Sequence, residues 1–315
     1  MKAFALTAPD QPAAFADLPD PELAADAVRI LVRAASVNGF DVYQANGALL
    51  GMMEHAMPTV IGRDFAGVVE AAGSARSDVG AGDKVLGFIP SAPPLHDGSY
   101  ADRITTSNVV LARKPARLSF ESAAAIPLAG ATALDAVDAI DPQAEDVVLV
   151  VGATGGVGSF AVQFAAQRGA TVIATARPGE EDAFVRALGA SDTVDWSSGD
   201  LAGIVQARRP DGVSALIDTV NRGDAFGEVA ALVRDGGRVA TTLGTADVEA
   251  LAARNVRATN IFGTPTADKL ATLAEAAAAG SLRVAVQHTF PLEEADQALQ
   301  VFADGTIGKL VLVTG

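Results

Sequence analysis

The most regular hydrophobic pattern in the chain is the unbroken β-branched and leucine run at residues 147–151, which leads directly into the glycine-rich segment 152–158. The run is too short to cross a membrane and too apolar for an exposed strand, so it predicts the central strand of a parallel sheet buried on both faces. Residues 159–167 then have helix-forming composition, and Gly169 ends them. The pattern therefore predicts a strand, a glycine turn and a helix in that order.

Two kinds of hydrophobic pattern divide the rest of the chain. In the first third, short β-type segments separated by glycines predict a small, mostly antiparallel, barrel-like domain, with strands at 28–37, 64–70, 83–88, 100–104 and 109–114. From about residue 118, alanine-rich helices alternate with apolar strands, which predicts a doubly wound parallel sheet with strands at 147–151, 171–176, 193–195, 215–220, 238–243 and 259–262. Two helices at 269–279 and 292–303 and a strand at 310–313 follow, and we expect this tail to return to the first domain.

Length and charge limit the possible partners. The chain has 315 residues, half of them apolar, which is enough for two domains of ordinary size. A formal net charge of −15 and the lack of a basic run argue against nucleic acid or an anionic membrane as partner, so a small molecule is the expected ligand. No segment approaches the roughly 18 apolar residues of a membrane span, and the first residues break too early for a signal peptide. We expect a cytoplasmic protein.

The chain contains no cysteine, which excludes disulfides, thiolate nucleophiles and cysteine-ligated zinc. The three histidines, His55, His96 and His288, show no metal-ligand spacing. We therefore expect no metal site.

The glycine turn predicts a phosphate site, because it brings bare backbone N–H groups and the positive end of a helix dipole to one place. A lone glycine motif is weak evidence, but here a strand precedes it and a helix follows it, as a dinucleotide-binding turn requires. The residues expected to surround the phosphates are Gly152, Ala153, Thr154, Gly155, Gly156 and Val157.

The end of the next strand indicates which dinucleotide is bound. In this fold an acidic residue about 20 residues past the glycines binds a free ribose 2′-hydroxyl, whereas an arginine accommodates a 2′-phosphate. This chain has Arg177 there and no acid at Ala176, which favours NADPH, the alternative being a solvated loop cation. Three acids follow at residues 180–182. With Pro178 as the first helical residue, they are expected to complement the helix dipole and to face away from the ribose.

Several segments together resemble the medium-chain dehydrogenase/reductase superfamily, in its zinc-independent quinone oxidoreductase (zeta-crystallin-like) branch: residues 36–41, 61–69, 82–87, 97–102, 124–133, the glycine turn and 308–312. The resemblance covers nearly the whole chain. It implies a GroES-like, barrel-like catalytic domain, formed by 1–116 and 264–315, into which a Rossmann domain at 117–263 is inserted. It also implies that the cofactor lies in the cleft between the two domains.

The resemblance also implies roles for individual residues. Asn38 and Asp41 would lie beside the nicotinamide and Thr132 under it; the alternatives are turn chemistry for the first two and a helix residue near a cap for the third. Trp196 would pack near the adenosine phosphate end, or lie in the core. Lys309 would lie near the cofactor phosphates, or be an exposed lysine at a strand edge.

The carboxyl ends of the later strands would complete the cofactor site, since open α/β sheets bind ligands there. The residues concerned are Thr219, Leu243, Gly244 and Phe262, of which Gly244 could equally be a simple turn residue. Zinc-dependent relatives carry a cysteine near the position of Asn38 and a Gly-His-Glu where this chain has Gly62-Arg63-Asp64. Zinc alcohol dehydrogenase activity is therefore not expected, and we interpret Arg63 and Asp64 as turn or ion-pair residues.

Without a metal, the accessible chemistry is hydride delivery to an acceptor that already stabilises negative charge, namely a quinone or an α,β-unsaturated carbonyl. Tyr43, five residues past Asn38, is the candidate proton donor; the alternatives are a packed aromatic or proton supply by water. The methionine-rich segment 48–57 either sets acceptor size or forms a core helix.

Two other functions stay open, an NADPH-binding structural or sensor protein and an enoyl-thioester reductase. Family members usually pair through an edge strand, so we expect a homodimer joined at residues 259–262.

Overall fold

The computed structural model describes all residues from Met1 to Gly315 and divides into two compact units. Unit 1 comprises Met1–Leu128 and Pro265–Gly315, and unit 2 comprises Ala129–Thr264. The first division lies later in the chain than residue 116 because helix α2 (Phe120–Ala124) packs on strands of unit 1. No helix is long and apolar enough to cross a membrane.

Unit 2 is built on a six-stranded parallel sheet in the order β11-β10-β9-β12-β13-β14. The strands are β9 (Val147–Val151), β10 (Thr171–Thr175), β11 (Asp192–Val194), β12 (Val213–Asp218), β13 (Val233–Thr241) and β14 (Arg257–Asn260). Numbered within this sheet the order is 3-2-1-4-5-6, in which the chain reverses direction of winding next to β9. The doubly wound sheet predicted from the hydrophobic pattern is confirmed, with the glycine turn at its centre.

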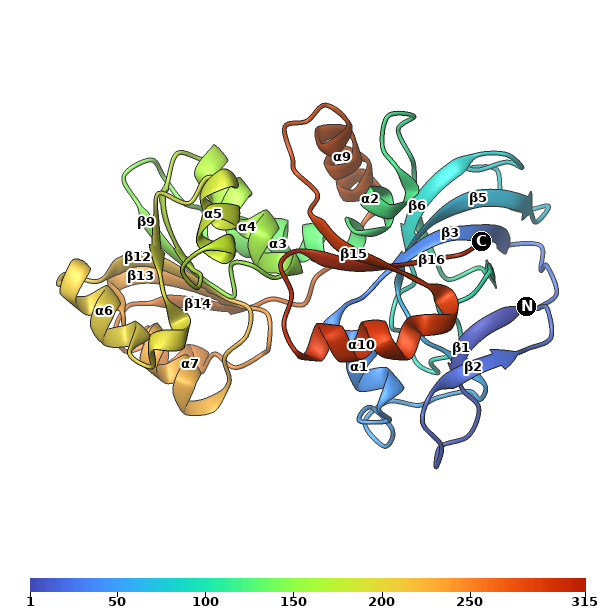
Figure 1. Cartoon of the computed structure of the whole chain (residues 1–315), viewed down its shortest axis with the longest axis horizontal. Helices are drawn as coiled ribbons and strands as arrows, with labels where there is room; N and C mark the ends of the chain where they lie inside the picture. Colours follow the sequence, from blue (N-terminus) through green and yellow to red (C-terminus); the bar gives the residue numbers. More distant parts are fainter. The chain divides into compact units, whose positions relative to one another are not determined.

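Helices cover both faces of this sheet, α3, α4 and α5 on one side and α6 and α7 on the other (Figure 1). They are α3 (Pro127–Ile140), α4 (Gly156–Gln167), α5 (Glu180–Ala187), α6 (Leu201–Arg208) and α7 (Gly223–Ala230), with a 3-10 turn η1 (Trp196–Ser198) and a short α8 (Val248–Ala252). The Leu, Val and Ile residues of the strands face these helices and form the core of the unit. Burial on both faces explains why the strands read as continuous apolar runs.

Unit 1 contains a seven-stranded, mostly antiparallel sheet and a three-stranded one. The larger sheet has the order β15-β16-β3-β5-β6-β8, with β7 also paired to β3, and the smaller has the order β2-β1-β4. The strands are β1 (Lys2–Leu6), β2 (Ala14–Asp17), β3 (Val28–Ser36), β4 (Thr59–Val60), β5 (Asp64–Ala72), β6 (Lys84–Phe88), β7 (Arg103–Thr106), β8 (Val110–Arg113), β15 (Val286–Pro291) and β16 (Lys309–Val313).

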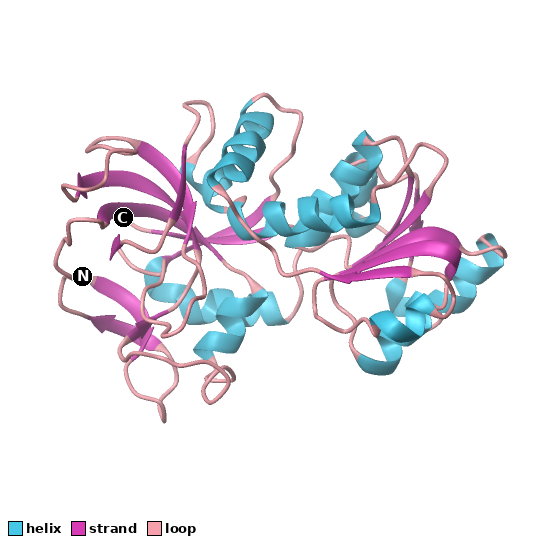
Figure 2. Cartoon of the chain, turned by 180° about the vertical axis from the view of Figure 1, so that it is seen from behind, coloured by secondary structure: helices cyan, strands magenta, loops and turns pink.

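Strand β16 brings the last residues of the chain beside the first long strand, because it pairs antiparallel with β3 in the register Val311↔Ser36. Helices α1 (Gly39–Ala45) and α10 (Ala295–Ala303) pack together in the same unit, and α9 (Ala267–Ala278) and a 3-10 turn η2 (Leu292–Glu294) complete it (Figure 2). Residues far apart in the sequence therefore meet at the ends of β3 and β16.

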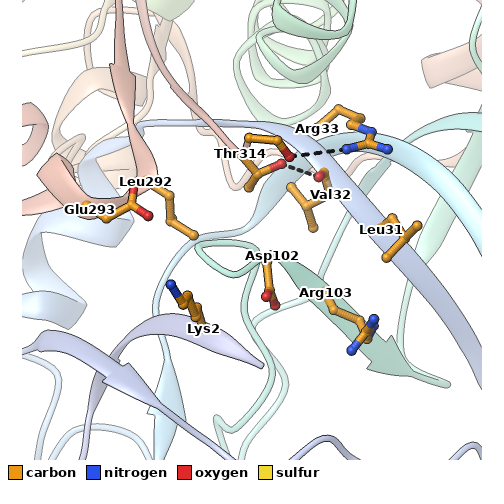
Figure 3. Close-up of a pocket in the computed structure, with 10 residues that line it drawn as sticks. Lys2, Leu31, Val32, Arg33, Asp102, Arg103, Leu292, Glu293 and Thr314 are labelled. Carbon is orange, nitrogen blue, oxygen red and sulfur yellow. Dashed lines mark hydrogen bonds between the residues drawn. The ribbon is translucent and has the colours of Figure 1, made fainter.

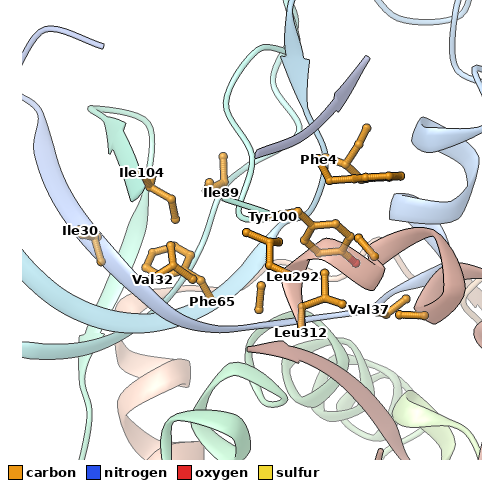
Figure 4. Close-up of a cluster of buried hydrophobic side chains, with 14 of the residues drawn as sticks. Phe4, Ile30, Val32, Val37, Phe65, Ile89, Tyr100, Ile104, Leu292 and Leu312 are labelled. Carbon is orange, nitrogen blue, oxygen red and sulfur yellow. The ribbon is translucent and has the colours of Figure 1, made fainter. Parts of the chain in front are cut away.

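The core of unit 1 is apolar, but Tyr100 and Arg63 are among its largest fully buried side chains. Figure 4 shows Tyr100 within this cluster, close to Phe4, Val37 and Leu312. A buried phenol and a buried guanidinium each need polar partners. Those partners form the polar network described below.

The core-helix alternative for residues 48–57 is wrong. Residues 48–57 form turns and isolated bridges, and the side chain of Met52 is 77% exposed, so this segment is not a core helix. Gly51 within the segment and Gly47 just before it have positive φ, which breaks a helix at both places. Strands β1, β2, β4 and β15 were not predicted, because β4 has only two residues and the other three are short and either alanine-rich or exposed along much of their length.

Candidate functional site

The glycine turn of unit 2 connects β9 to α4 through tightly fixed backbone. Gly152 has φ +79°, a left-handed conformation that favours glycine, and its N–H donates to Thr175 Oγ1 on the neighbouring strand at 3.0 Å. The N–H of Gly155 donates to the carbonyl of Gly152 at 3.1 Å. Gly155 is the N-cap of α4, and no side chain caps that helix end. The first N–H groups of α4 are therefore left without a capping side chain.

Two glycines of the turn allow its close packing. A Cβ on Gly158 would lie 2.1 Å from the Gly152 carbonyl oxygen, and a Cβ on Gly152 would lie 2.3 Å from Thr219 Oγ1. The Thr219 hydroxyl itself donates to the Val151 carbonyl at 3.0 Å. A helix packed this closely on a bare turn presents its N-terminal dipole to an anion, which fits the pyrophosphate of a dinucleotide.

The other predicted cofactor residues of unit 2 lie within α3 or just after strands β13 and β14. Thr132 is buried in α3 next to Gly263, where a Cβ would come within 1.9 Å of the Thr132 hydroxyl. Leu243 and Gly244 follow β13, and Gly244 has a positive φ, as a turn residue does. Phe262 is 77% exposed just after β14. Ligand contact by these residues stays a prediction.

Arg177, Glu181 and Trp196 form a cluster at the end of β10. Glu181 Oε1 accepts from Arg177 Nε at 2.7 Å and lies 2.6 Å from Nη2, while Glu181 Oε2 accepts from the Arg177 backbone N–H at 2.7 Å and from Trp196 Nε1 at 3.1 Å. The guanidinium carbon lies 5.3 Å from the indole centroid, a cation–π geometry. We name these three residues the arginine cluster.

This cluster corrects two expectations. Glu181, expected to serve the helix dipole and to face away from the ribose, instead turns back onto Arg177, the residue predicted to bind the ribose phosphate. Pro178 is not the first helical residue, since α5 begins at Glu180 with Gly179 as N-cap. The physical reason is that Glu181, four residues after Arg177, is close enough for its carboxylate to accept from both the side chain and the backbone N–H of Arg177. Trp196 is half exposed, so it is not a core residue.

The contacts set the charge states of the pair. Burial alone would raise the pKa of Glu181, but the hydrogen bonds from Arg177 and Trp196 outweigh it and lower that pKa. The hydrogen bond to Glu181 raises the pKa of Arg177. Both groups are therefore charged at neutral pH.

In unit 1, Asn38 lies two residues past the end of β3 and is the N-cap of α1, and its backbone N–H donates to Asp41 Oδ2 at 2.9 Å. Tyr100 Oη donates to the same oxygen at 3.0 Å. Asp41 Oδ1 has no hydrogen-bond partner, and the residue has no exposed surface. Asp41 therefore fixes the start of α1 from inside the protein. This geometry supports a role for Asp41 in positioning Asn38, which is 7% exposed and so lies nearer to solvent than the fully buried Asp41.

The Asn38 side chain is fixed from both sides. Lys309 Nζ donates to Asn38 Oδ1 at 2.6 Å and to the Val37 carbonyl at 2.7 Å, and Asn38 Nδ2 donates to Asp64 Oδ2 at 3.0 Å. Asp64 Oδ2 also accepts from Ser36 Oγ at 3.1 Å, and the Leu128 N–H donates to the Asp64 carboxylate at 3.1 Å. Lys309 is only 3% exposed on β16, an interior strand, so the exposed strand-edge alternative is wrong.

Arg63 lies at the other side of Asp41. Its Nη2 donates to Gln44 Oε1 at 2.9 Å and its Nη1 donates to the Asp97 carbonyl at 3.1 Å, while the guanidinium stacks over Phe40 at 5.0 Å. No group of three or more His, Cys, Asp or Glu side chains could hold a metal ion. The guanidinium of Arg63 already supplies a positive charge close to Asp41 and Asp97, and it would repel a metal cation there. The residues present therefore do not fit a zinc site.

Burial governs the pKa values of this polar network. Desolvation, together with the charge of Asp64, raises the pKa of Asp41 to about 7, and desolvation raises the pKa of Asp64 to about 6. Desolvation lowers the pKa values of Lys309 and Arg63, against the pull of the carboxylates. Two carboxyl groups and two cations thus share one buried region.

The two tyrosines differ in environment. Tyr43, on α1, is 47% exposed and lies outside the polar network, whereas Tyr100 is fully buried and bonded to Asp41. Tyr100, Ser36 and Gln44 were not predicted as site residues, and Glu181 was predicted only as an acid that complements the helix dipole. Only Glu181 carried a local signal, its spacing of four residues from Arg177.

A separate pocket of about 230 Å³ lies in unit 1 and is lined by none of the predicted site residues. Figure 3 shows Lys2, Asp102 and Thr314 around it, and Arg33 Nη1 donates to the Gly315 carbonyl at 3.3 Å on its rim. Its lining mixes both signs of charge and has no evident single ligand chemistry.

Comparison with known proteins gives a consistent result. Residues 24–115 match the family described as "Alcohol dehydrogenase GroES-like domain", and residues 188–312 match that described as "Zinc-binding dehydrogenase". A solved structure of the quinone oxidoreductase from Coxiella burnetii is 31% identical with a TM-score of 0.88, over 99% of both chains.

Two curated relatives are also similar. The trans-enoyl reductase tndF of Aspergillus flavipes is 36% identical over 67% of this chain and 64% of its own length. The chloroplastic NADPH-dependent alkenal/one oxidoreductase of Arabidopsis thaliana is 32% identical over 71% of this chain and 57% of its own length. The match thus spans less than two thirds of these relatives. The fold, the ordered motifs and these likenesses together mean that the chain belongs to the medium-chain dehydrogenase/reductase superfamily, in its quinone oxidoreductase branch.

Proposed function

We propose that this protein is a zinc-independent, NADPH-dependent oxidoreductase that transfers hydride to a quinone or to the β-carbon of an α,β-unsaturated carbonyl. The observation that carries the proposal is the uncapped glycine turn at α4 with Arg177 after the neighbouring strand, which suits the pyrophosphate and the 2′-phosphate of NADPH. The names of the similar proteins, a quinone oxidoreductase and an alkenal/one oxidoreductase, support the acceptor class.

The bound nicotinamide would supply the hydride, and the chain would position the reactants and exclude water. Asn38 is the group of the polar network that we assign to direct contact. Lys309 holds its carbonyl oxygen and Asp64 takes one of its two amide hydrogens, which leaves the second hydrogen for a ligand oxygen. A donor fixed in advance stabilises developing negative charge without reorganising.

No step of this mechanism uses a metal. Quinones and enones spread the incoming charge over their own conjugated system, so a hydrogen-bond donor and a proton source suffice. The exposed hydroxyl of Tyr43 is one candidate proton source, and water is the other.

The test is NADPH oxidation by the purified protein with 9,10-phenanthrenequinone and with a simple enone, in the presence of a chelator. We expect turnover with at least one acceptor and no loss on chelation. Thermal protection by NADPH without oxidation of it by either acceptor would instead identify a cofactor-binding structural or sensor protein.

The Asn38 role has its own control. Asn38→Ala should lower kcat/KM roughly 10- to 100-fold, the range of a lost oxyanion donor. Asn46→Ala, at the exposed other end of α1, should leave it unchanged. Equal kinetics for the two variants would remove Asn38 from the site, and unchanged turnover in Tyr43→Phe would remove Tyr43 as proton donor.

An enoyl-thioester acceptor is the second candidate, because one similar protein is named a trans-enoyl reductase. An enoyl thioester added to the same assay distinguishes the two, since preference for it over quinone and enone would favour this candidate.

We also propose a homodimer joined through the edge strand β14, whose outer side has no partner strand within the sheet. Size-exclusion chromatography with light scattering should give the mass of two chains, and a monomer would contradict the proposal.

A further inference from the structure

Both oxygens of the Glu181 carboxylate in the arginine cluster are fully used by donors from within the chain. Oε2 accepts from the Arg177 backbone and from the Trp196 indole, and Oε1 lies within 2.7 Å of both Nε and Nη2 of Arg177. The Glu181 side chain is 7% exposed, while that of Arg177 is 56% exposed. The carboxylate is therefore closed to ligands and the guanidinium is open.

The guanidinium is also fixed in direction. Glu181 binds its Nε and Nη2 side, and Trp196 lies against its face at 5.3 Å, so the Nη1 end is left to meet a ligand. This end carries two donors, and Arg177 lies just past the carboxyl end of the second strand of the sheet, where this fold holds the adenine ribose of a dinucleotide. The positive charge behind those donors is offset by a carboxylate less than 3 Å away.

We propose that Glu181 sets the cofactor preference of this protein, holding Arg177 in place while offsetting its charge, so that NADPH is only modestly preferred and NADH is also accepted. This inference rests on the proposed function. A 2′-phosphate gains a hydrogen bond from an oriented donor, but the nearby Glu181 carboxylate repels it, which reduces the affinity advantage of NADPH over NADH. A 2′-hydroxyl meets no unpaired carboxylate that needs a partner, so NADH is not rejected.

A purely structural ion pair would predict something different. An ion pair with one partner more than half exposed contributes little to stability, and removing it would not change the ratio of two cofactors' affinities. The ratio of the NADPH and NADH dissociation constants, measured by titration calorimetry, therefore separates the two roles.

Two single variants should shift the ratio of NADPH to NADH affinity in opposite directions. Glu181→Gln keeps a side-chain oxygen as acceptor but removes the negative charge, and should raise the preference for NADPH by roughly 5- to 30-fold, mainly through tighter NADPH binding. Arg177→Ala uncovers the Glu181 carboxylate and should reverse the preference to NADH, with NADPH weakened by roughly 10- to 100-fold.

The double variant Arg177→Ala/Glu181→Gln separates repulsion from misfolding. Without the uncovered carboxylate, it should bind NADPH more tightly than Arg177→Ala alone. Asp182→Asn is the matched control, because Asp182 makes an exposed ion pair with Arg186 at 3.0 Å, four residues apart on the same helix. This control should leave the ratio as in the wild type.

The outcomes are distinguishable. Failure of the wild-type protein to bind either dinucleotide would overturn the proposed function itself. Wild-type binding with an unchanged ratio in Glu181→Gln, or an equal weakening of both cofactors in that variant, would overturn only the role of Glu181.

Discussion

Each unit of the protein ties a cation to a carboxylate by hydrogen bonds, but the two arrangements differ in exposure. In unit 1, Lys309 and Asp64 are bridged by the Asn38 amide and lie almost entirely out of solvent. In unit 2, Arg177 contacts Glu181 directly and is half exposed. The buried set can act only through the side chain that it orients, whereas the exposed set can meet a ligand with its own charge. Burial therefore distinguishes the positioning role proposed for Lys309 and Asp64 from the recognition role proposed for Arg177.

The largest effect expected from this difference is on stability when Lys309 is replaced. Lys309→Met leaves the buried Asp64 without its nearest compensating cation, which should lower the free energy of unfolding by about 3–5 kcal/mol. Urea unfolding measures this. Lys84→Met, on the exposed start of β6, should change it by less than about 0.5 kcal/mol. Similar losses in both variants would show that burial does not distinguish them.

Glycine substitutions test the packing of the glycine turn. Gly158→Ala forces a Cβ to within 2.1 Å of the Gly152 carbonyl oxygen and should cost about 1–3 kcal/mol of stability, with NADPH affinity reduced. Gly227→Ala, in α7, has open space around the new methyl group and should instead stabilise the protein slightly. Thermal unfolding with and without NADPH measures both, and a tolerated Gly158→Ala would contradict the close approach.

The buried network should also respond to pH. Asp41 has its pKa raised to about 7 by burial and by Asp64, against the opposing effects of Arg63 and Lys309. Between its ordinary pKa near 4 and this value, the folded state keeps a proton that the unfolded state has lost, so its contribution to stability declines as pH rises toward 7. Asp41 Oδ1, which has no partner, is free to carry that proton.

The variant Asp41→Asn lacks this titration. Between pH 5 and pH 7.5, a range that covers most of the interval between the two pKa values of Asp41, the melting temperature of the variant should therefore fall less than that of the wild type. The half-exposed ion pair of unit 2 predicts no such change for Glu181→Gln, because its pKa lies below this range. Parallel pH profiles for the wild type and Asp41→Asn would contradict the raised pKa.

The smallest effect compares two serines that each donate to an aspartate. Ser36→Ala loses a buried bond to Asp64, which keeps other donors, and should cost about 1 kcal/mol. Ser197→Ala loses an exposed bond to Asp195 and should be neutral in the same urea measurement. A larger loss of unfolding free energy in Ser197→Ala than in Ser36→Ala would mean that exposure does not determine how much these hydrogen bonds contribute to stability.

The fold was predictable because its signals are local. The apolar run before the glycines and the alternation of strands with alanine-rich helices predicted the parallel sheet, which the structure confirms. The glycine turn was readable for the same reason, since strand, turn and helix are adjacent in sequence. The core-helix alternative for segment 48–57 failed because apolar composition alone does not show that Gly47 and Gly51 adopt positive φ.

The polar network was less predictable because its members come from distant segments. Nothing local links Ser36, Asp64 and Lys309, which meet only through the pairing of β3 with β5 and β16. Tyr100 was overlooked in favour of Tyr43, since nearness in sequence to Asn38 does not measure nearness in space. The contact of Glu181 with Arg177 had a local signal, but the helix dipole offered a competing explanation for an acid in that first turn.

The pairing of β16 with β3 also sets an order of events during synthesis. Unit 2 is continuous, so all of its strands leave the ribosome before β16 does. Unit 1 cannot complete its larger sheet or its polar network until Lys309 has emerged, more than 240 residues after Asp64. On a nascent chain, all of unit 2 is therefore available for folding while the Asn38 side chain still lacks its contact with Lys309, so the site proposed around Asn38 is the last part of the protein to be assembled.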